Sequence, residues 1–428
     1  MTEALKDSKV SWLGEIPESW SIDRTKFHYL NLKQVAGVKS KDYERLALTL
    51  NGVIKRPKDD TDGLQPGDFN GYQILRSGDL VFKLIDLQNV STSRVGLAHD
   101  TGIVSPAYIR LEPRKNDSSR YGEYYFLSMW QREIFNQLGD AGVRSNLSST
   151  DLLELPYIKL PYEDQIKIAD FLDEKCAEID HLSEDIQKQI DTLEEYKKSV
   201  ITRAVTKGLN PNTEMKDSGI QWIGKMNSAF ARKKIKNACS MIGSGTTPQS
   251  SNTEFYNDGS INWIQSGDIY GKEEITDVAV KVTPMALHAS SSLKVYKAPF
   301  IVIAMYGGSV GNTAISRINA CTNQAVCCLK PNSDTNLEYL YYWIQFCKED
   351  FLVKAEGGGQ PNISQDKIRN QWILLPDIDE QEKIVAYLDK ICDEINDSIA
   401  TKRRQIENLD TYKKSIIYEY VTGKKRVA

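Results

Sequence analysis

The C-terminal part of this chain repeats a segment from its middle at a fixed offset. Residues 165–206 match residues 381–422 at 18 of 42 positions. The matches include Gln165 with Gln381, Leu172 with Leu388, Cys176 with Cys392, and the run Lys-Lys-Ser at 197–199 with that at 413–415. A second repeat pairs DSKVSWLG at 7–14 with DSGIQWIG at 217–224. Duplication of this kind predicts two copies of one structural unit, each a variable region followed by a long conserved segment.

The conserved segments have the apolar spacing of long amphipathic helices. In the first segment, apolar residues recur every seven positions, with Leu182 and Tyr196 at intervening positions, and the series is Leu172, Ile179, Ile186, Leu193 and Val200. The second segment keeps this phase but places Lys402 where the first has Ile186. Pro161 and Pro211 bracket the first segment, and Gly208 stands near its end. A helix over residues 164–206 would be roughly 65 Å long.

A heptad seam of this kind predicts helix–helix packing. A single amphipathic helix would instead pack on its own domain, but two matched helices favour packing on each other as an antiparallel coiled coil. The residues expected at this coil or subunit interface are Leu172, Ile179, Ile186, Leu193 and Tyr196 in the first helix, and Leu388, Ile395, Leu409 and Tyr412 in the second.

The regions between the helices are expected to be α+β domains. Short apolar runs at 79–82 and 300–305 are typical of strands, and helices are expected over 121–135 and 337–353. The predicted organisation is a first domain at 1–160, a central helix at 161–210, a second domain at 211–376 and a distal helix at 377–428.

The sequence lacks the usual signatures of catalysis and of metal binding. It has no GxxxxGK[ST] phosphate loop, and its four histidines have no zinc-ligand spacing. The seven cysteines form no CxxC pair, which is typical of a protein from the reducing cytoplasm. No apolar run approaches a membrane span, and the N-terminus does not resemble a signal peptide. We therefore expect a cytoplasmic chain with no catalytic residues, no metal site and no cofactor of its own.

Polar loops in both α+β regions could recognise the edges of DNA bases. Lysine and arginine can donate to guanine, asparagine and glutamine can pair with adenine, and hydroxyl groups can serve either base. The candidates in the first region are Lys55, Arg56, Lys58, Lys83 and Arg144. Those in the second region are Thr246, Thr247, Gln249, Gln265, Tyr306, Asn323, Gln324 and Gln360. Lys233 and Lys234 belong to a basic run that suits phosphate contacts. For each of these residues, the alternative is an ordinary solvated side chain.

The charge distribution indicates different partners for the long helices and for the α+β regions. The net charge is −4, and residues 161–210 carry seven basic and twelve acidic side chains. Such an acidic helix suits a protein partner better than it suits a phosphate backbone.

Several motifs, in order along the chain, resemble the specificity subunit of type I restriction-modification enzymes. They are WLGEIPESW at 12–20, GIVSPAY at 102–108, IGSGTTP at 242–248 with WIQSGD at 263–268, and the Leu-Pro dipeptides that precede Gln165 and Gln381. The second copy departs from the first after Gly224, where MNSAF at 226–230 replaces IPESW.

The resemblance implies two target recognition domains joined by an antiparallel coiled coil, and a bipartite, asymmetric site on double-stranded DNA. It also implies two modification subunits, which are adenine methyltransferases that use S-adenosylmethionine, and a restriction subunit that is a translocase and nuclease. Two domains that each contact a major groove require half-sites about one helical turn apart, roughly 34 Å.

Two other functions are compatible with parts of the sequence. A coiled-coil adaptor would bind proteins through its globular regions without binding DNA, whereas a DNA-binding chain should lose affinity steeply as salt rises. A stand-alone nuclease would need a cluster of carboxylates around a metal ion, which the sequence does not provide.

Overall fold

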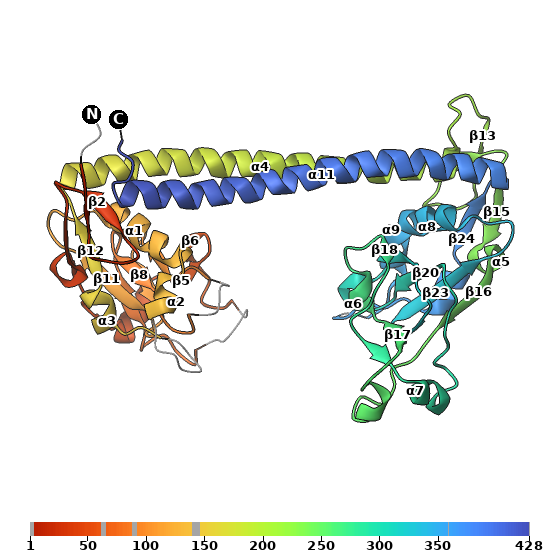
Figure 1. Ribbon diagram of the computed structural model, residues 1–428, viewed down its shortest axis with the longest axis horizontal. Coiled ribbons are helices and arrows are strands. Elements are labelled where there is room, and N and C mark those ends of the chain that lie inside the picture. Colours follow the sequence, from red (N-terminus) through yellow and green to blue (C-terminus); the bar gives the residue numbers. More distant parts are fainter. Residues whose placement is uncertain (1–3, 61–65, 88–91, 139–145, 358, 428) are drawn as a thin grey trace. The chain divides into compact units, whose positions relative to one another are not determined.

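The computed structural model describes residues 4–60, 66–87, 92–138, 146–357 and 359–427 (Figure 1). The chain divides into two compact units. Unit 1 comprises residues 1–187 and 403–428, and unit 2 comprises residues 188–402. Each unit therefore contains one α+β region together with parts of both long helices.

The two long helices are α4 (Tyr162–Lys207) and α11 (Ile378–Val421). In unit 1, the Asp180 carboxylate pairs with Lys413, and the ring of Phe171 lies 4.4 Å from that of Tyr420 between centroids. In unit 2, Lys402 bonds to Gln189 and Lys197 bonds to Asn396. In both units the residue number rises along α4 as it falls along α11. The predicted antiparallel coiled coil and the α+β fold class are confirmed.

The apolar seam follows the predicted heptads only in part. Leu172, Ile179, Ile186, Leu388 and Ile395 are buried, while Leu193 and Leu409 are half-buried. Leu182, Tyr196 and Tyr412 are 49%, 54% and 55% exposed and lie off the helix–helix seam. The assignment of Tyr196 and Tyr412 to a coil or subunit interface stays a prediction. A helix with 3.6 residues per turn drifts by about 20° in each heptad. Ile190, four residues after Ile186, is buried instead.

Unit 1 is built from short antiparallel sheets covered by helices. Among the described residues, one sheet has four strands in the order β4-β11-β8-β9, and there are also four two-stranded antiparallel sheets: β1-β2, β3-β12, β5-β6 and β7-β10. The strands are β1 (Leu5–Asp7), β2 (Glu15–Pro17), β3 (Ser21–Arg24), β4 (Tyr29–Leu30), β5 (Leu46–Thr49), β6 (Gly52–Lys55), β7 (Gln73–Leu75), β8 (Leu80–Phe82), β9 (Val95–Leu97), β10 (Gly102–Val104), β11 (Ile109–Pro113) and β12 (Pro156–Lys159). The helices before α4 are η1 (Thr25–Phe27), η2 (Gly37–Asp42), α1 (Ser119–Gln131), α2 (Ile134–Leu138) and α3 (Ser149–Glu154).

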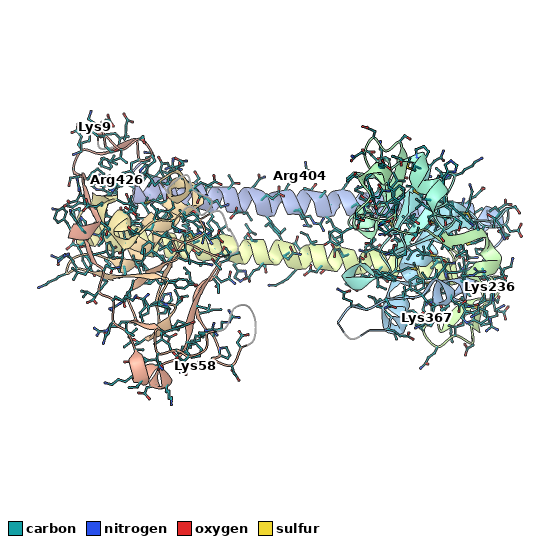
Figure 2. The ribbon with its side chains drawn as sticks, turned by 90° about the horizontal axis from the view of Figure 1, so that it is seen from below. Lys9, Lys58, Lys236, Lys367, Arg404 and Arg426 are labelled. Carbon is teal, nitrogen blue, oxygen red and sulfur yellow. The ribbon has the colours of Figure 1, made fainter. Side chains whose placement is uncertain are left out.

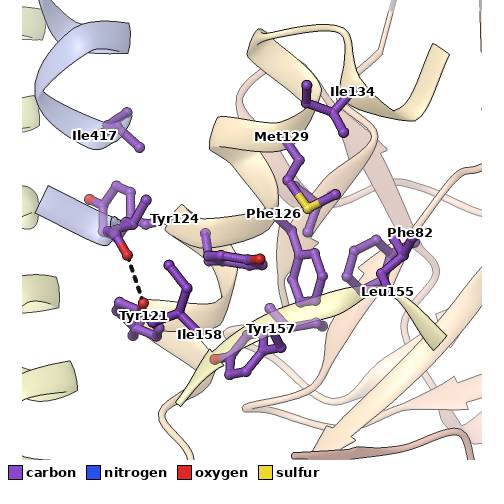
Figure 3. Close-up of a cluster of buried hydrophobic side chains, with 14 of the residues drawn as sticks. Phe82, Tyr121, Tyr124, Phe126, Met129, Ile134, Leu155, Tyr157, Ile158 and Ile417 are labelled. Atoms are coloured by element: carbon purple, nitrogen blue, oxygen red, sulfur yellow. Dashed lines mark hydrogen bonds between the residues drawn. The ribbon is translucent and has the colours of Figure 1, made fainter. Parts of the chain in front are cut away.

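The core of unit 1 lies between α1, the sheets and the long helices. Figure 3 shows aromatic side chains of this core, among them Phe82, Phe126 and Tyr157, packed edge to face or at a tilt. Ile417 of α11 belongs to the same buried cluster. The α+β region and the helix ends therefore share one core in this unit.

Unit 2 has a larger sheet. Five strands lie in the order β16-β23-β20-β21-β18, and a second sheet has the order β19-β17-β22. The strands are β13 (Met215–Asp217), β14 (Lys225–Asn227), β15 (Ala231–Lys234), β16 (Cys239–Ser244), β17 (Ile261–Ile264), β18 (Glu274–Ile275), β19 (Lys281–Val282), β20 (Phe300–Ala304), β21 (Thr313–Ser316), β22 (Ala320–Thr322), β23 (Val326–Pro331) and β24 (Trp372–Leu375). The helices are α5 (Ile235–Ala238), η3 (Thr253–Phe255), α6 (Ser266–Ile269), α7 (Pro284–Ala289), η4 (Gly307–Ser309), α8 (Leu337–Phe346), α9 (Lys348–Lys354) and α10 (Gln365–Arg369).

The predicted strands at 79–82 and 300–305 correspond to β8 and β20, whereas both predicted domain helices are interrupted. The first breaks after α1, where Glu133 adopts a left-handed conformation with φ 58°. This backbone conformation cannot continue a right-handed helix. The second breaks at Cys347, which separates α8 from α9.

The two units repeat a set of anchoring contacts. The side-chain oxygen of Gln165 accepts a hydrogen bond from the N–H of Ser118, and that of Gln381 accepts one from the N–H of Asn336, each at 2.8 Å. Ser118 and Asn336 are the N-cap residues of α1 and α8. Gln165 and Gln381 belong to the first turn of α4 and of α11. The hairpin β13-β14 repeats β1-β2 despite its different sequence. Phe230 is buried after the second hairpin, as Trp20 is after the first.

Candidate nucleic-acid interface

The polar candidates of unit 2 converge where several strands end. Strands β17 and β22 run parallel, with Ile264 opposite Thr322. Parallel strands end at the same edge of a sheet, so Gln265 and Asn323 emerge side by side. The N–H of Asn323 donates to the carbonyl of Ile264 at 3.1 Å.

The loop after β16 closes onto the same edge. The hydroxyl of Thr247 donates to the side-chain oxygen of Gln324 at 2.7 Å, and the N–H of Gly245 donates to the hydroxyl of Thr322 at 3.0 Å. A Cβ atom at Gly245 would lie 1.8 Å from the carbonyl oxygen of Thr322. Only glycine therefore permits this approach, and it holds Thr246 and Thr247 beside β22.

The loops after β20 and before α10 complete the edge. Strand β20 ends at Ala304, which pairs with Val326 at the start of the antiparallel strand β23. Tyr306, two residues after the end of β20, therefore lies close to the start of β23. The N–H of Gly307 donates to the carbonyl of Pro361 at 2.7 Å, which holds the loop containing Gln360 against this turn. We call this set the polar rim; its members are Thr246, Thr247, Gln265, Tyr306, Asn323, Gln324 and Gln360.

The polar rim presents neutral hydrogen-bonding groups to solvent. Thr247, Gln324 and Gln360 are exposed, and Tyr306 is 45% exposed. Amide and hydroxyl groups at strand ends can donate to and accept from base edges. Gln249 lies farther along its loop and bonds to the hydroxyl of Ser251 at 3.1 Å.

The basic residues Lys233 and Lys234 are separated from the polar rim. Both lie on β15, which pairs with β24. Helix α5 connects β15 to the start of β16, whereas the polar rim lies at the end of β16. The ammonium group of Lys234 lies 3.4 Å from the ring centroid of Trp372. Burial and then neighbouring cations lower the pKa of Lys234. Lys236 and Lys367 add to the positive charge of unit 2 and are labelled in Figure 2. These lysines suit phosphate contacts more than base contacts.

Three candidates of unit 1 already have partners within the protein. Lys55 pairs with Asp100 at 3.0 Å, and Arg56 bonds to Asp60 at 2.5 Å. Lys58, at the periphery of unit 1 in Figure 2, donates to the carbonyl of Ser40 at 2.9 Å. Such bonds order the segment after β6 and leave further donors for a ligand.

Lys83 and Arg144 differ from these candidates. Lys83 is half-buried beside Thr92, and burial followed by the charge of Arg94 lowers its pKa. Arg144 lies outside the described residues.

The exposed side chains of Val38 and Tyr270 were not among the predicted site residues. Val38 is 85% exposed in η2, which also carries Lys39 and Lys41. Tyr270 is 76% exposed and directly follows α6, whose first turn is capped by Gln265 of the polar rim. An aromatic residue beside a glycine in a polar stretch was the available signal for Tyr270.

No group of three or more His, Cys, Asp or Glu side chains among the described residues could hold a metal ion. No helix in the described part of the chain combines the length and the apolar character needed to cross a membrane.

Comparisons with known proteins point to one family. Residues 227–408 match the family of the Type I restriction modification DNA specificity domain. The chain is 25% identical over 443 residues to a putative type I restriction enzyme specificity subunit, MjaX, of Methanocaldococcus jannaschii, and the alignment covers 98% of this chain and 96% of the relative. It is 31% identical over 159 residues to the type I restriction enzyme EcoR124I/EcoR124II specificity subunit of Escherichia coli, which is 36% of this chain and 39% of the relative.

A solved structure shares the fold. A chain from work on complex assembly and conformational transition of the type I R-M system matches with a TM-score of 0.70. The sequence identity is 15%, and the match covers 96% of this chain and 99% of the other.

Proposed function

The chain belongs to the family of type I restriction enzyme specificity subunits, and from this premise we propose that it recognises a bipartite, asymmetric sequence in double-stranded DNA. One half-site would be contacted by the α+β region of unit 1 and the other by that of unit 2. The catalytic steps would belong to partner subunits.

The polar rim of unit 2 is the observation that carries this proposal. Five separate segments of the sequence converge there, and they present amides and hydroxyls rather than a charged or apolar surface. Such groups can discriminate between base pairs in the major groove. The lysines of β15 lie elsewhere on unit 2 and would supply phosphate contacts, which position a protein on the duplex without selecting a sequence.

The chemistry of the two units supports two different half-sites. The candidates of unit 1 are lysines and arginines, and carbonyl or carboxylate partners order Lys55, Arg56 and Lys58. Those of unit 2 are mainly neutral. Cationic donors favour guanine, whereas Gln and Asn side chains pair well with adenine. An asymmetric site follows from this difference.

The long helices would provide the scaffold for protein partners. Tyr196 and Tyr412 occupy equivalent positions of the repeat, and both are more than half exposed. Packing within the chain does not require an exposed aromatic residue at the same place twice. We infer that each tyrosine anchors one copy of the same partner, a modification subunit that uses S-adenosylmethionine. A restriction translocase-nuclease would join the assembly. A cytoplasmic location stays a prediction.

Selection from a pool of random duplexes tests the DNA part of the proposal. The full chain, with its modification subunits, should enrich two short motifs separated by a spacer of constant length. Affinity for the selected duplex should fall steeply between about 50 and 200 mM salt, because phosphate contacts release counterions. Enrichment of no motif, with no salt-dependent binding, would favour the coiled-coil adaptor.

A further inference from the structure

A three-residue node joins the α+β region of unit 2 to both long helices. The ammonium group of Lys197 on α4 donates to the carboxylate of Glu273 at 2.9 Å and to the side-chain oxygen of Asn396 on α11 at 2.8 Å. The amide of Asn396 also donates to Glu273, at 3.1 Å. Glu273 lies in the loop before β18, so three separate elements meet in one closed triangle of hydrogen bonds.

We propose that Glu273 is a positioning residue, which fixes the α+β region of unit 2 on the helix pair and thereby orients the polar rim for its half-site. This inference rests on the proposed function. It deepens that function, because it assigns the discrimination of one half-site to a residue outside the rim.

Comparison with unit 1 shows that Glu273 replaces a helix carboxylate. At the repeat offset of 216, Lys197 corresponds to Lys413 and Asn396 corresponds to Asp180. In unit 1, both carboxylate oxygens of Asp180 accept from Lys413 at 2.7 Å. In unit 2 the helix carries an amide at this place, and the carboxylate comes from the α+β region instead. The charge balance around the lysine is kept, but the bond now crosses from helix to domain.

A second difference between the units concerns the ion pairs that tie each α+β region to the long helices. In unit 1, Arg120 of α1 forms an ion pair with Asp173 of α4, which ties the α+β region to the helix. The corresponding residues of unit 2 are Glu338 and Asp389, and two carboxylates repel each other. Glu338 pairs with Arg317 within the α+β region instead, at 3.4 Å. The ionic tie to the long helices has therefore moved to Glu273.

The node is linked to the polar rim by a short stretch of chain. Gln265 caps α6, Ile269 of α6 is buried, and β18 begins at Glu274. The segment 265–275 thus runs from the rim to the helix pair. Loss of the bond at Glu273 would release one end of this segment, and Gln265 lies at the other end.

The electrostatic environment keeps Glu273 ionised at neutral pH. Partial burial alone would raise the pKa of Glu273, but the hydrogen bond and charge of Lys197 and the amide of Asn396 lower it overall. The side chain of Lys197 is 18% exposed and that of Glu273 is 52% exposed. Solvent screens such a pair in part, so its loss should loosen the segment without unfolding the unit.

Three variants and a matched control test the proposal. Glu273→Gln removes the charge, and Asn396→Asp introduces the carboxylate of unit 1. The double variant Glu273→Gln/Asn396→Asp rebuilds the pairing of unit 1. Glu274→Gln is the control, since Glu274 pairs with Arg317 and not with a long helix.

Two measurements separate positioning from stability. Selection from random duplexes gives the discrimination at each half-site, and hydrogen exchange over residues 265–275 reports the mobility of the segment. Glu273→Gln should reduce discrimination at one half-site by about two- to fivefold, as expected for loss of an exposed ion pair, and leave the other half-site unchanged. Exchange over 265–275 should accelerate in this variant but not in Glu274→Gln.

The double variant supplies the decisive comparison. It should recover thermal stability, because a carboxylate again faces Lys197, but it should not recover discrimination, because that carboxylate belongs to α11. Recovery of both properties would show that Glu273 acts only through stability and would overturn the proposal. So would equal losses at both half-sites, or exchange rates that match those of the control. If the wild-type chain selects no motif, the proposed function fails, and the exchange data still decide whether Glu273 holds the segment.

Discussion

The phenol of Tyr121 donates a hydrogen bond of 2.8 Å to the backbone carbonyl of Val421, a residue 300 positions later in the chain (Figure 3). In unit 2, the phenol of Tyr339 donates to the carbonyl of Val205 at 3.3 Å. Val205 and Val421 are equivalent in the repeat and lie in the last turns of α4 and α11. Each α+β region thus holds the start of one long helix and the end of the other.

Replacement of Tyr121 with phenylalanine should destabilise unit 1. The substitution leaves the carbonyl of Val421 without this donor in a buried site, and an unsatisfied buried group costs about 1–3 kcal/mol. Urea unfolding of the full chain measures the loss. Tyr412→Phe removes a phenol that is 55% exposed and should leave the free energy of unfolding nearly unchanged. Equal effects of the two substitutions would contradict the structural role of the bond.

The buried glutamines at the helix starts should stabilise their own units separately. Gln165→Leu removes the acceptor for the N–H of Ser118 and the donor to the carbonyl of Leu160. Hydrogen exchange should increase in unit 1, by an amount that corresponds to about 1–3 kcal/mol for each unsatisfied group. Gln381→Leu should act in the same way on unit 2 alone. Simultaneous opening of both units in either variant would argue against separate anchoring.

Substitution in the polar rim should relax specificity at one half-site. Gln324→Ala removes an exposed amide that can form paired hydrogen bonds to a base, and a good pair contributes about 1–3 kcal/mol of discrimination. We expect roughly tenfold weaker preference at one base pair in duplex selection, with the other half-site unaffected. Gln405→Ala, on the exposed surface of α11, is the matched control. An unchanged motif would remove Gln324 from the list of base-contacting residues.

The polar interruption of the seam should reduce the stability of the coil. Lys402 is half-buried and donates to the side-chain oxygen of Gln189 at 2.5 Å. A groove of about 380 Å³ lies beside this pair and is lined by Lys188, Gln189, Thr192, Leu193 and Lys402. Lys402→Leu would restore the apolar character that Ile186 has in the other copy. The expected gain is about 1 kcal/mol in urea unfolding, since partial burial of a leucine contributes less than full burial. A lower midpoint would show that the lysine contributes more than its apolar replacement.

Three buried or half-buried thiols should make the protein less stable at alkaline pH. Burial raises the pKa of Cys392 from its ordinary value of 9.0 to about 11, and that of Cys239 and Cys321 to about 12. The folded state therefore holds these protons more tightly than the unfolded chain does. Their contribution to stability is complete below pH 9 and is lost as the pH rises from 9 towards 11 or 12. Urea unfolding under reducing conditions at pH 8 and pH 10 measures the loss, and Cys392→Ala should show a smaller pH effect than the wild type. An identical pH effect would contradict the assignment.

The sequence alone determined the features that depend on local pattern. The seven-residue apolar spacing and the internal duplication specify two long helices, because helix formation and amphipathicity are read from neighbouring positions in the chain. The order of the motifs along the chain was likewise enough to indicate the family.

Only the tertiary structure decided which residues meet. Tyr196 and Tyr412 have the right spacing for the seam, yet the drift of a real helix turns them towards solvent. The strand order brings Gln265 beside Asn323, and Thr247 beside Gln324, across gaps of 58 and 77 positions. The role of Glu273 could not be predicted for the same reason. Its local sequence does not distinguish a solvated loop carboxylate from one that bonds to two helices. Strand order and register depend on packing between distant segments, and no local pattern encodes that packing.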